Sequence, residues 1–301
     1  MTGFRERLAR GDVLVGDGAW GTLLMERGLP PGRPPEWFAL ERPEVLEEIA
    51  GLYAEAGADL VTTDTFGGTA FRLALHGLEK DRDRVNRGAV EATRRGVASR
   101  ALVSASVGPT GRLLEPFGDT SPHAAFEAFA EQVASLASAG ADLVCVETMS
   151  DLTEATRAVR AAQSAATGLP VIATMTFEPT PRGYFTVMGV SVERAVKGLE
   201  DAGADVVGSN CGTGIADMIG IARELVCFAK RPIAVQPNAG LPESRGQGVV
   251  YRETPETLAA RVPELLDLGV RLVGGCCGTT PDHVRAVRRV VSTWRREHDR
   301  V

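Results

Sequence analysis

The 301-residue chain is 44% apolar and 24% charged and carries a formal net charge of −6. That charge disfavours nucleic acid or a membrane surface as the main partner, because either would favour a basic stripe. No apolar run approaches the roughly 18 residues of a membrane-spanning helix, and the first residues lack the apolar core of a secretory signal. We therefore expect a cytoplasmic protein with no nucleic-acid or membrane partner.

A short repeated motif indicates how the chain is organised. The run Ala-Gly-Ala-Asp-Leu-Val at 56–61 recurs at 139–144 and, in altered form, at 202–207 and 268–273. Apolar residues at helical spacing precede each copy. Glycine suits the left-handed residue that ends a helix, and the apolar run behind it is typical of a buried parallel strand. Each copy therefore predicts one helix-to-strand junction.

Other runs rich in β-branched residues complete a set of eight predicted strands. In chain order they are 13–17, 59–63, 102–106, 142–147, 171–176, 205–210, 233–236 and 271–275. Helical patterns separate them, and several begin with proline in the first turn, after Ser121, Thr254 and Thr280. This alternation predicts an α/β fold, a single (β/α)8 TIM barrel that spans residues 1–301 as one domain. A doubly wound open sheet is the alternative, although no dinucleotide-binding glycine pattern follows the first strand.

The lengths of the connections predict where the functional site lies. Helix-to-strand joints are short, whereas the segments that follow strands are long and rich in proline and glycine, at 18–42, 107–120, 177–189 and 237–252. Function in this fold gathers at the carboxyl ends of the strands. Polar residues at those ends are Asp17, Thr63, Asp64, Thr65, Ser106, Glu147, Thr148, Asn210, Cys211, Gln236, Asn238, Cys276 and Cys277.

Three cysteines fall in this ring, Cys211 after strand six and Cys276 with Cys277 after strand eight. Those strands are near neighbours around a closed barrel, and three thiolates with one open position are typical of catalytic zinc. Adjacent residues on a regular strand face opposite ways, so both Cys276 and Cys277 reach one metal only if the backbone turns irregular. The glycines at 274, 275 and 278 permit that.

Two simpler interpretations of the cysteines remain open at this point. Five cysteines are no disulfide framework in a cytosolic chain, but a vicinal disulfide between Cys276 and Cys277 is conceivable. The three residues could also be packed and inert, as Cys145 and Cys227 are expected to be. The histidines lie in or beside predicted helices and make poor ligands. A basic cluster at 285–296 around Trp294 is most simply a solvated face.

A three-cysteine zinc site predicts activation of a nucleophile. A thiol substrate in the open position would be held as the thiolate near neutral pH. Asp17 and Glu147 could bind a substrate ammonium group, and backbone N–H groups of glycine-rich turns could bind its carboxylate. The alternative for each acid is that it caps the following helix.

Six motifs occur in the order found in the homocysteine S-methyltransferase family, which the chain resembles over nearly its whole length. They are Gly-Asp-Gly-Ala-Trp-Gly-Thr at 16–22, Thr-Asp-Thr-Phe at 63–66, Ser-Val-Gly-Pro-Thr at 106–110, Glu-Thr at 147–148, Ser-Asn-Cys at 209–211 and Gly-Gly-Cys-Cys-Gly-Thr-Thr-Pro at 274–281. The resemblance implies one Zn²⁺ on Cys211, Cys276 and Cys277. It also implies homocysteine as the thiol that completes the zinc shell and is methylated to methionine. Its amino-acid end would lie near Asp17, Gly18, Thr63, Glu147 and Asn210.

The sequence says less about the identity of the methyl donor. Cation–π boxes for quaternary ammonium groups need aromatic residues, and Gly67 stands where betaine-dependent members of the family are expected to have tyrosine. The donor is expected to be a methylcorrinoid supplied by a separate corrinoid protein or a small methylated onium compound. The small residues Gly67, Gly68 and 210–214 suggest an open rim, which favours the corrinoid.

Two other functions are weighed beside homocysteine methylation. The chain could be the methyltransferase subunit of a corrinoid demethylation system with another thiol acceptor. It could instead be a non-catalytic zinc-binding barrel that docks a partner protein, although an open zinc position is the catalytic kind.

Overall fold

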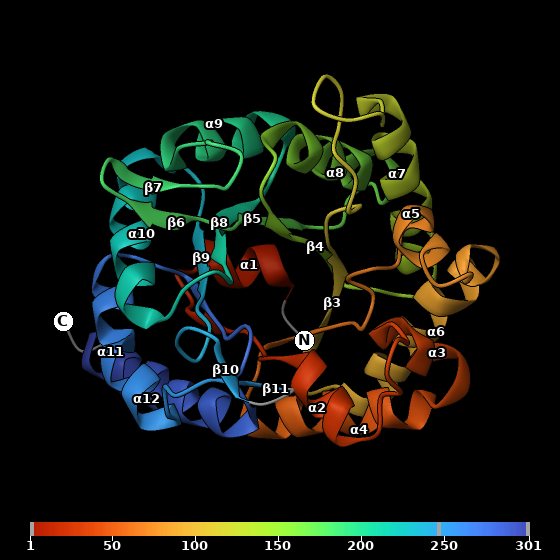
Figure 1. The fold of residues 1–301 in the computed structure, drawn as a ribbon. Coiled ribbons are helices and arrows are strands. Elements are labelled where there is room, and N and C mark those ends of the chain that lie inside the picture. The colour runs from red at the N-terminus through yellow and green to blue at the C-terminus, as the bar shows by residue number, and fades with distance from the viewer. Residues whose placement is uncertain (1–2, 246–247, 299–301) are drawn as a thin grey trace.

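The computed structural model describes residues 3–245 and 248–298, and in it eight parallel strands curl into a barrel inside a ring of helices (Figure 1). The strand order is β1-β12-β9-β8-β5-β4-β3-β2. The strands are β1 (Leu14–Val15), β2 (Leu60–Thr62), β3 (Leu102–Val107), β4 (Leu143–Met149), β5 (Val171–Met175), β8 (Val206–Asn210), β9 (Ile233–Gln236) and β12 (Leu272–Val273). Each overlaps one predicted strand. The predicted TIM barrel is therefore confirmed, and the open doubly wound sheet is excluded.

The repeated motif marks the helix ends as expected. Gly57 and Gly203 follow α4 and α9 in the left-handed conformation, with φ of 100° and 105°. Ser121 and Thr254 cap two of the helices whose first residue is proline. The helices are α1 (Phe4–Ala9), α2 (Trp20–Glu26), α3 (Phe38–Glu41), α4 (Pro43–Ala56), α5 (Ala70–Ala74), α6 (Arg82–Val97), α7 (Pro122–Ser138), α8 (Leu152–Ala165), α9 (Val192–Ala202), α10 (Ile215–Phe228), α11 (Pro255–Asp267) and α12 (Pro281–His298), with short 3₁₀ turns η1 (Pro35–Trp37) and η2 (Glu79–Asp81).

The amino-terminal end of the barrel is closed by a short helix that the sequence did not predict. Helix α1 lies across the middle of the barrel in Figure 1, and its Phe4 is buried against the inward-facing side chains of the strands. Those side chains include Leu14, Leu60, Leu102, Cys145 and Ile172. Because apolar side chains fill the barrel interior at this end, we look for the functional site at the opposite, carboxyl end of the strands.

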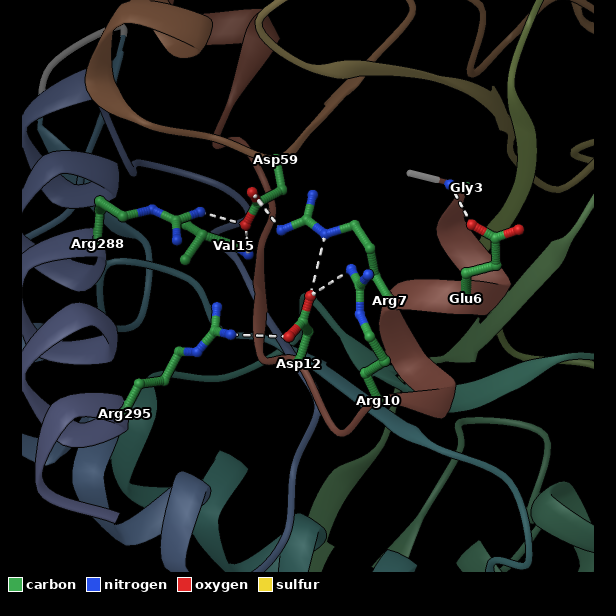
Figure 2. Close-up of polar contacts among 9 residues, drawn as sticks. All are labelled: Gly3, Glu6, Arg7, Arg10, Asp12, Val15, Asp59, Arg288 and Arg295. Carbon is green, nitrogen blue, oxygen red and sulfur yellow. Dashed lines mark hydrogen bonds and ion pairs between the residues drawn. The ribbon is translucent and has the colours of Figure 1, made fainter. Parts of the chain in front are cut away.

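Strands β1 and β2 meet through a side chain as well as through the backbone. The Asp59 amide donates to the Val15 carbonyl at 2.7 Å, and the Val15 amide donates back to the Asp59 carboxylate at 2.8 Å. Arg7 and Arg288 also bind this carboxylate, and Arg295 binds Asp12 at 2.7 Å (Figure 2). The expectation of a solvated basic face on α12 is therefore wrong for Arg288 and Arg295, because Arg288 forms an ion pair with Asp59 and Arg295 forms one with Asp12.

The long segments after the strands carry structure of their own. The first contains α2, η1 and α3, and two others fold into the hairpins β6 (Glu178–Thr180) with β7 (Gly183–Phe185) and β10 (Glu243–Arg245) with β11 (Gly248–Val250). Within residues 3–245 and 248–298, no helix is both long and apolar enough to cross a membrane.

Candidate metal and substrate site

Three cysteine sulfurs converge where β8 and β12 end. The Sγ atoms of Cys211, Cys276 and Cys277 lie within 4.8 Å of one another, and those of Cys211 and Cys277 are 3.7 Å apart. All five cysteines are free thiols in the structure. Cys145 is buried in the barrel core and Cys227 is exposed on α10, so neither joins the cluster. Strands β8 and β12 each pair with β9, so one strand separates them and brings the cysteines together as predicted.

An irregular backbone aims the paired cysteines at one point. Strand β12 ends at Val273, and the Thr279 amide donates to the Cys276 carbonyl at 3.1 Å, which closes a turn. Gly278 has a φ of 79°, and a Cβ atom there would overlap the Tyr251 ring. Cys211 itself has a φ of 62°, a conformation that is uncommon for a residue with a side chain. The turn therefore needs glycine at 278, as the sequence suggested.

The three thiols cannot all ionise in this position without a cation. Hydrogen bonds from Cys211 and Cys276 lower the pKa of the Cys277 thiol to about 3, whereas contact with Cys211 and Cys277 raises the pKa of Cys276 well above its usual range. Negative charge on one sulfur therefore makes it costlier to ionise its neighbour. A divalent cation would remove this conflict, and three sulfurs at this spacing form a donor set that fits a thiophilic metal.

A cavity of about 620 Å³ opens beside the cysteines. Asp17, Gly18, Thr63 and Glu147 all line it, together with the three cysteines. In this cavity the structure brings together most of the residues predicted to bind the substrate.

Two carboxylates line this cavity, the buried Asp17 after β1 and the half-buried Glu147 on β4. Asp17 Oδ2 accepts hydrogen bonds from Trp20 Nε1 at 3.0 Å and from the Thr62 amide at 2.8 Å. Glu147 accepts one from Ser106 Oγ at 2.5 Å. Burial raises the pKa of Asp17 to about 6 and that of Glu147 to about 7, against the opposing effect of these hydrogen bonds. Carboxylates that are costly to ionise in this way suit a cationic ligand group, which would restore their charge.

Asn210 occupies a different place from the other predicted substrate residues. It is fully buried and is not among the residues that line the cavity. Its carboxamide oxygen accepts hydrogen bonds from the Thr148 amide at 2.8 Å and from Thr174 Oγ1 at 2.7 Å, and its nitrogen donates to Thr148 Oγ1 at 2.7 Å. The same nitrogen lies 3.8 Å from Cys276 Sγ. Asn210 thus links the end of β4 to the cysteine cluster.

A bulge near the end of β4 explains why Glu147 and Thr148 both face the cavity. The register of β4 against β5 shifts between Val146 and Met149, and Thr148 has a φ of 60°. Adjacent residues on a regular strand would face opposite ways, so the bulge is what presents both side chains. The two hydrogen bonds between Asn210 and Thr148 hold this strained residue in place.

Two residues in or beside the cavity were not singled out from the sequence. Glu36 from η1 lines it, and burial raises the pKa of its carboxyl group above the usual range. Tyr251 lies against the turn at Gly278, and burial, together with the neighbouring Cys277 sulfur, raises the pKa of its phenol. Glu36 follows two prolines in a segment that resembles a surface loop, so no local pattern marks it.

The small residues near the mouth do not leave an open rim. A Cβ atom at Gly67 would lie 2.6 Å from Glu36 Oε1, and one at Gly68 would overlap Asn86 Oδ1. A Cβ atom at Gly212 would lie 2.7 Å from the Thr176 side chain. Neighbouring atoms already fill the space beside these glycines, so their small size does not by itself open the rim, and the corrinoid donor stays a prediction.

These features define a class of protein, a TIM barrel with three clustered cysteine sulfurs that could hold a metal ion at the carboxyl ends of its strands. Comparison with known proteins narrows this class. Residues 14–291 match the homocysteine S-methyltransferase family. The chain is 38% identical to the methionine synthase of Mycobacterium leprae over 93% of its length and 36% identical to that of Mycobacterium tuberculosis over 96%. It spans only about a quarter of these relatives, 24% and 25% of their lengths.

Solved structures agree with this placement. The metallated form of the homocysteine methyltransferase MmuM from Escherichia coli superposes with a TM-score of 0.78 at 25% identity, over 95% of this chain and 98% of that one. The carboxyl transferase domain of Rhizobium etli pyruvate carboxylase, at 16% identity and a TM-score of 0.53, shares the fold alone. The chain belongs to the homocysteine S-methyltransferase family, as its motifs predicted.

Proposed function

We propose that this protein transfers a methyl group to the sulfur of homocysteine, giving methionine, at a zinc ion held by Cys211, Cys276 and Cys277. The convergence of the three sulfurs beside a cavity lined by the carboxylates of Asp17 and Glu147 carries this proposal. Membership of the family supports the acceptor, and the metallated form of the E. coli relative supports the metal. The need for reduced cysteines is consistent with a cytoplasmic location, which we propose with it.

The donor set suits zinc better than a hard cation, because thiolates are soft ligands and three of them leave one position for substrate. Zinc bound there would hold the homocysteine sulfur as the thiolate at neutral pH. Asp17 and Glu147 would bind the substrate ammonium group, with Gly18 and Thr63 beside it. Asn210 would position Glu147 and Cys276 rather than touch homocysteine.

The transfer is an in-line displacement at the donor methyl. The thiolate supplies the electron pair of the new carbon–sulfur bond, and the bond between the methyl and the donor breaks with its electrons left on the donor. We propose a methylcorrinoid on a separate protein or a small onium compound as the donor. Buried walls around the reacting atoms would exclude water as a competing nucleophile.

The test measures zinc content and methionine formation in the wild type, Cys276→Ala and Cys227→Ala. Homocysteine is supplied with betaine, S-methylmethionine, methylcobalamin or methyltetrahydrofolate in turn. We expect Cys276→Ala to lose activity with every donor, because it removes one sulfur of the cluster. Cys227→Ala should keep full zinc and activity, because Cys227 is exposed on α10.

Three outcomes would contradict the proposal. Cys276→Ala that methylates homocysteine at the wild-type rate would rule out the metal site. A different thiol acceptor against which homocysteine does not compete would point to a corrinoid demethylation system. Tightly bound zinc whose coordination does not change when any thiol is added would indicate a non-catalytic barrel that docks a partner protein.

A further inference from the structure

The two segments that carry the cysteines are built alike. Helix α10 begins at Ile215, four residues after Cys211, and α12 begins at Pro281, four residues after Cys277. The position of each sulfur therefore depends on where the amino-terminal end of the following helix is held. One residue, Glu253 in the segment between β11 and α11, is hydrogen-bonded to both of these ends.

The side chain of Glu253 caps α10. Gly214, the N-cap residue of this helix, has no side chain to accept the free amides of the first turn. Glu253 Oε2 accepts a hydrogen bond from the Ile215 amide at 3.3 Å instead, from 38 residues further along the chain. A carboxylate also suits the positive end of the helix dipole. A serine at 214 would cap the helix from within its own segment, whereas a cap from Glu253 ties the helix to a second segment.

The backbone of Glu253 holds α12 through a histidine. His283 is buried in the first turn of α12. Its Nδ1 accepts a hydrogen bond from the Thr280 amide at 3.1 Å, so the ring proton lies on Nε2, which donates to the Glu253 carbonyl at 3.0 Å. His283 thus caps α12 and links it to the residue that caps α10.

Backbone hydrogen bonds fix the segment after β9 between the two cysteine segments. The Ala239 amide donates to the Cys277 carbonyl at 2.9 Å, and the Asn238 amide donates to the Thr213 carbonyl at 3.0 Å. The Glu253 amide donates to the Ala239 carbonyl at 2.9 Å. Glu253 is therefore attached to this middle segment as well as to both helices.

This close approach requires glycine at 214. A Cβ atom there would overlap Glu253 Oε1 and would lie 3.0 Å from the Gly240 Cα atom. Gly214 has a φ of −82° and extended backbone, a conformation that other residues adopt without strain. The glycine is therefore explained by the space that its neighbours occupy and not by its own backbone conformation.

We propose that Glu253 is a positioning residue for the metal site, which holds Cys211 and the Cys276–Cys277 turn at one fixed separation. This inference rests on the proposed function, whose metal site it concerns. Glu253 and His283 are not among the residues that line the cavity, so they act through the cysteines and not on the substrate. Thiolates repel one another, so a frame that keeps them together before the metal arrives should strengthen metal binding.

The first experiment measures zinc affinity by competition with a chelator, together with urea unfolding of the same proteins without metal. We expect Glu253→Ala to lower the zinc affinity about tenfold or more, as loss of groups that orient metal ligands commonly does. Glu253→Gln keeps an oxygen for the Ile215 amide and should retain most of the affinity.

Glu200→Ala is the matched control. Glu200 is half-buried like Glu253, and its carboxylate also accepts amide hydrogen bonds from a distant segment, those of Lys230 and Arg231 just before β9. We expect this variant to lose a similar amount of stability in urea and to keep the wild-type affinity for zinc, because the segment it anchors carries none of the three clustered cysteines.

The second experiment displaces the carboxylate without changing Glu253. We expect Gly214→Ala to lower the zinc affinity about as much as Glu253→Ala. Added to Glu253→Ala, the same substitution should have a smaller effect, because the side chain that it overlaps is then absent.

Two results would overturn the inference and leave the proposed function intact. They are wild-type zinc affinity in Glu253→Ala, and a loss of affinity in Glu200→Ala as large as that in Glu253→Ala. A wild-type protein that binds no zinc, or that forms no methionine with any donor, would instead count against the proposed function.

Discussion

Asp17 shows how one residue sets ligand binding against stability. Its carboxylate is buried, and the hydrogen bonds from Trp20 and Thr62 offset only part of the cost of ionising it there. A protein selected for stability alone would favour a neutral residue at this position. A cationic ligand group would offset the cost of this charge, and in our proposal that group is the ammonium of homocysteine.

We expect Asp17→Asn to stabilise the ligand-free protein in a pH-dependent way. The pKa of Asp17 rises from 3.8 to about 6 on folding, so ionisation of the carboxyl group costs the folded state about 3 kcal/mol at neutral pH. The folded wild type binds the extra proton between about pH 4 and pH 6, and its relative stability falls as the pH rises through that window. Urea unfolding of both proteins at several pH values tests this.

The Asp17→Asn variant should therefore gain up to about 3 kcal/mol above pH 6 and little below pH 4. The same variant should bind homocysteine less tightly, because the amide carries no charge. A stability difference that is constant across pH, or one that grows at low pH, would show that Asp17 is not a desolvated carboxylate.

Among the structural elements, the turn after β12 matters most for the site. Cys276 and Cys277 reach the same point because the strand stops at Val273 and the chain reverses at Gly278. The Tyr251 ring fills the space where a side chain at 278 would stand. The turn thus depends on both the conformation and the small size of this glycine.

We expect Gly278→Ala to weaken zinc binding more than Gly269→Ala. Both glycines have positive φ, 79° and 93°, so alanine at either should cost about 1 kcal/mol of unfolding free energy. Only the methyl group at 278 meets a neighbour, since nothing lies within 4 Å of a Cβ atom at 269. Competition with a chelator measures the zinc affinity, and equal affinities in the two variants would contradict this account of the turn.

A second element-level prediction concerns the seam between β1 and β2. Asp59→Ala removes the acceptor of the Val15 amide and leaves Arg7 and Arg288 without their carboxylate. These side chains are mostly buried, so we expect a loss of about 3 kcal/mol in urea unfolding. Asp201→Ala, which breaks the exposed pair with Lys197, should have no measurable effect. Similar small effects of both substitutions would show that the seam does not depend on Asp59.

At the scale of the whole molecule, the regular parts of the fold were predictable because each depends on local chemistry. The four copies of the repeated motif mark helix-to-strand junctions, since glycine ends a helix and a buried parallel strand is continuously apolar. The clustering of the cysteines followed from counting strands around a closed barrel. Helix α1 was not predicted, because its six residues carry too little periodicity and it is held by burial of Phe4.

Only those residues of the site that stand at the ends of strands could be predicted from the sequence. Asp17, Thr63 and Glu147 could be placed from the barrel alone, whereas Glu36 comes from a 3₁₀ turn whose position depends on tertiary packing. Gly67 was interpreted as open space because a sequence does not show what stands beside a glycine. The ion pair between Arg288 and Asp59 could not be predicted either, because the two residues are far apart in the chain.

The most direct test of the central claim is zinc X-ray absorption spectroscopy on the metal-loaded protein with and without homocysteine. We predict three sulfur ligands from the cysteine cluster at about 2.3 Å, and one additional sulfur when homocysteine is added. Cys276→Ala should lose one sulfur from both spectra. A zinc shell that contains fewer than three sulfurs, or one that homocysteine leaves unchanged, would contradict the claim that this cluster activates the substrate thiol.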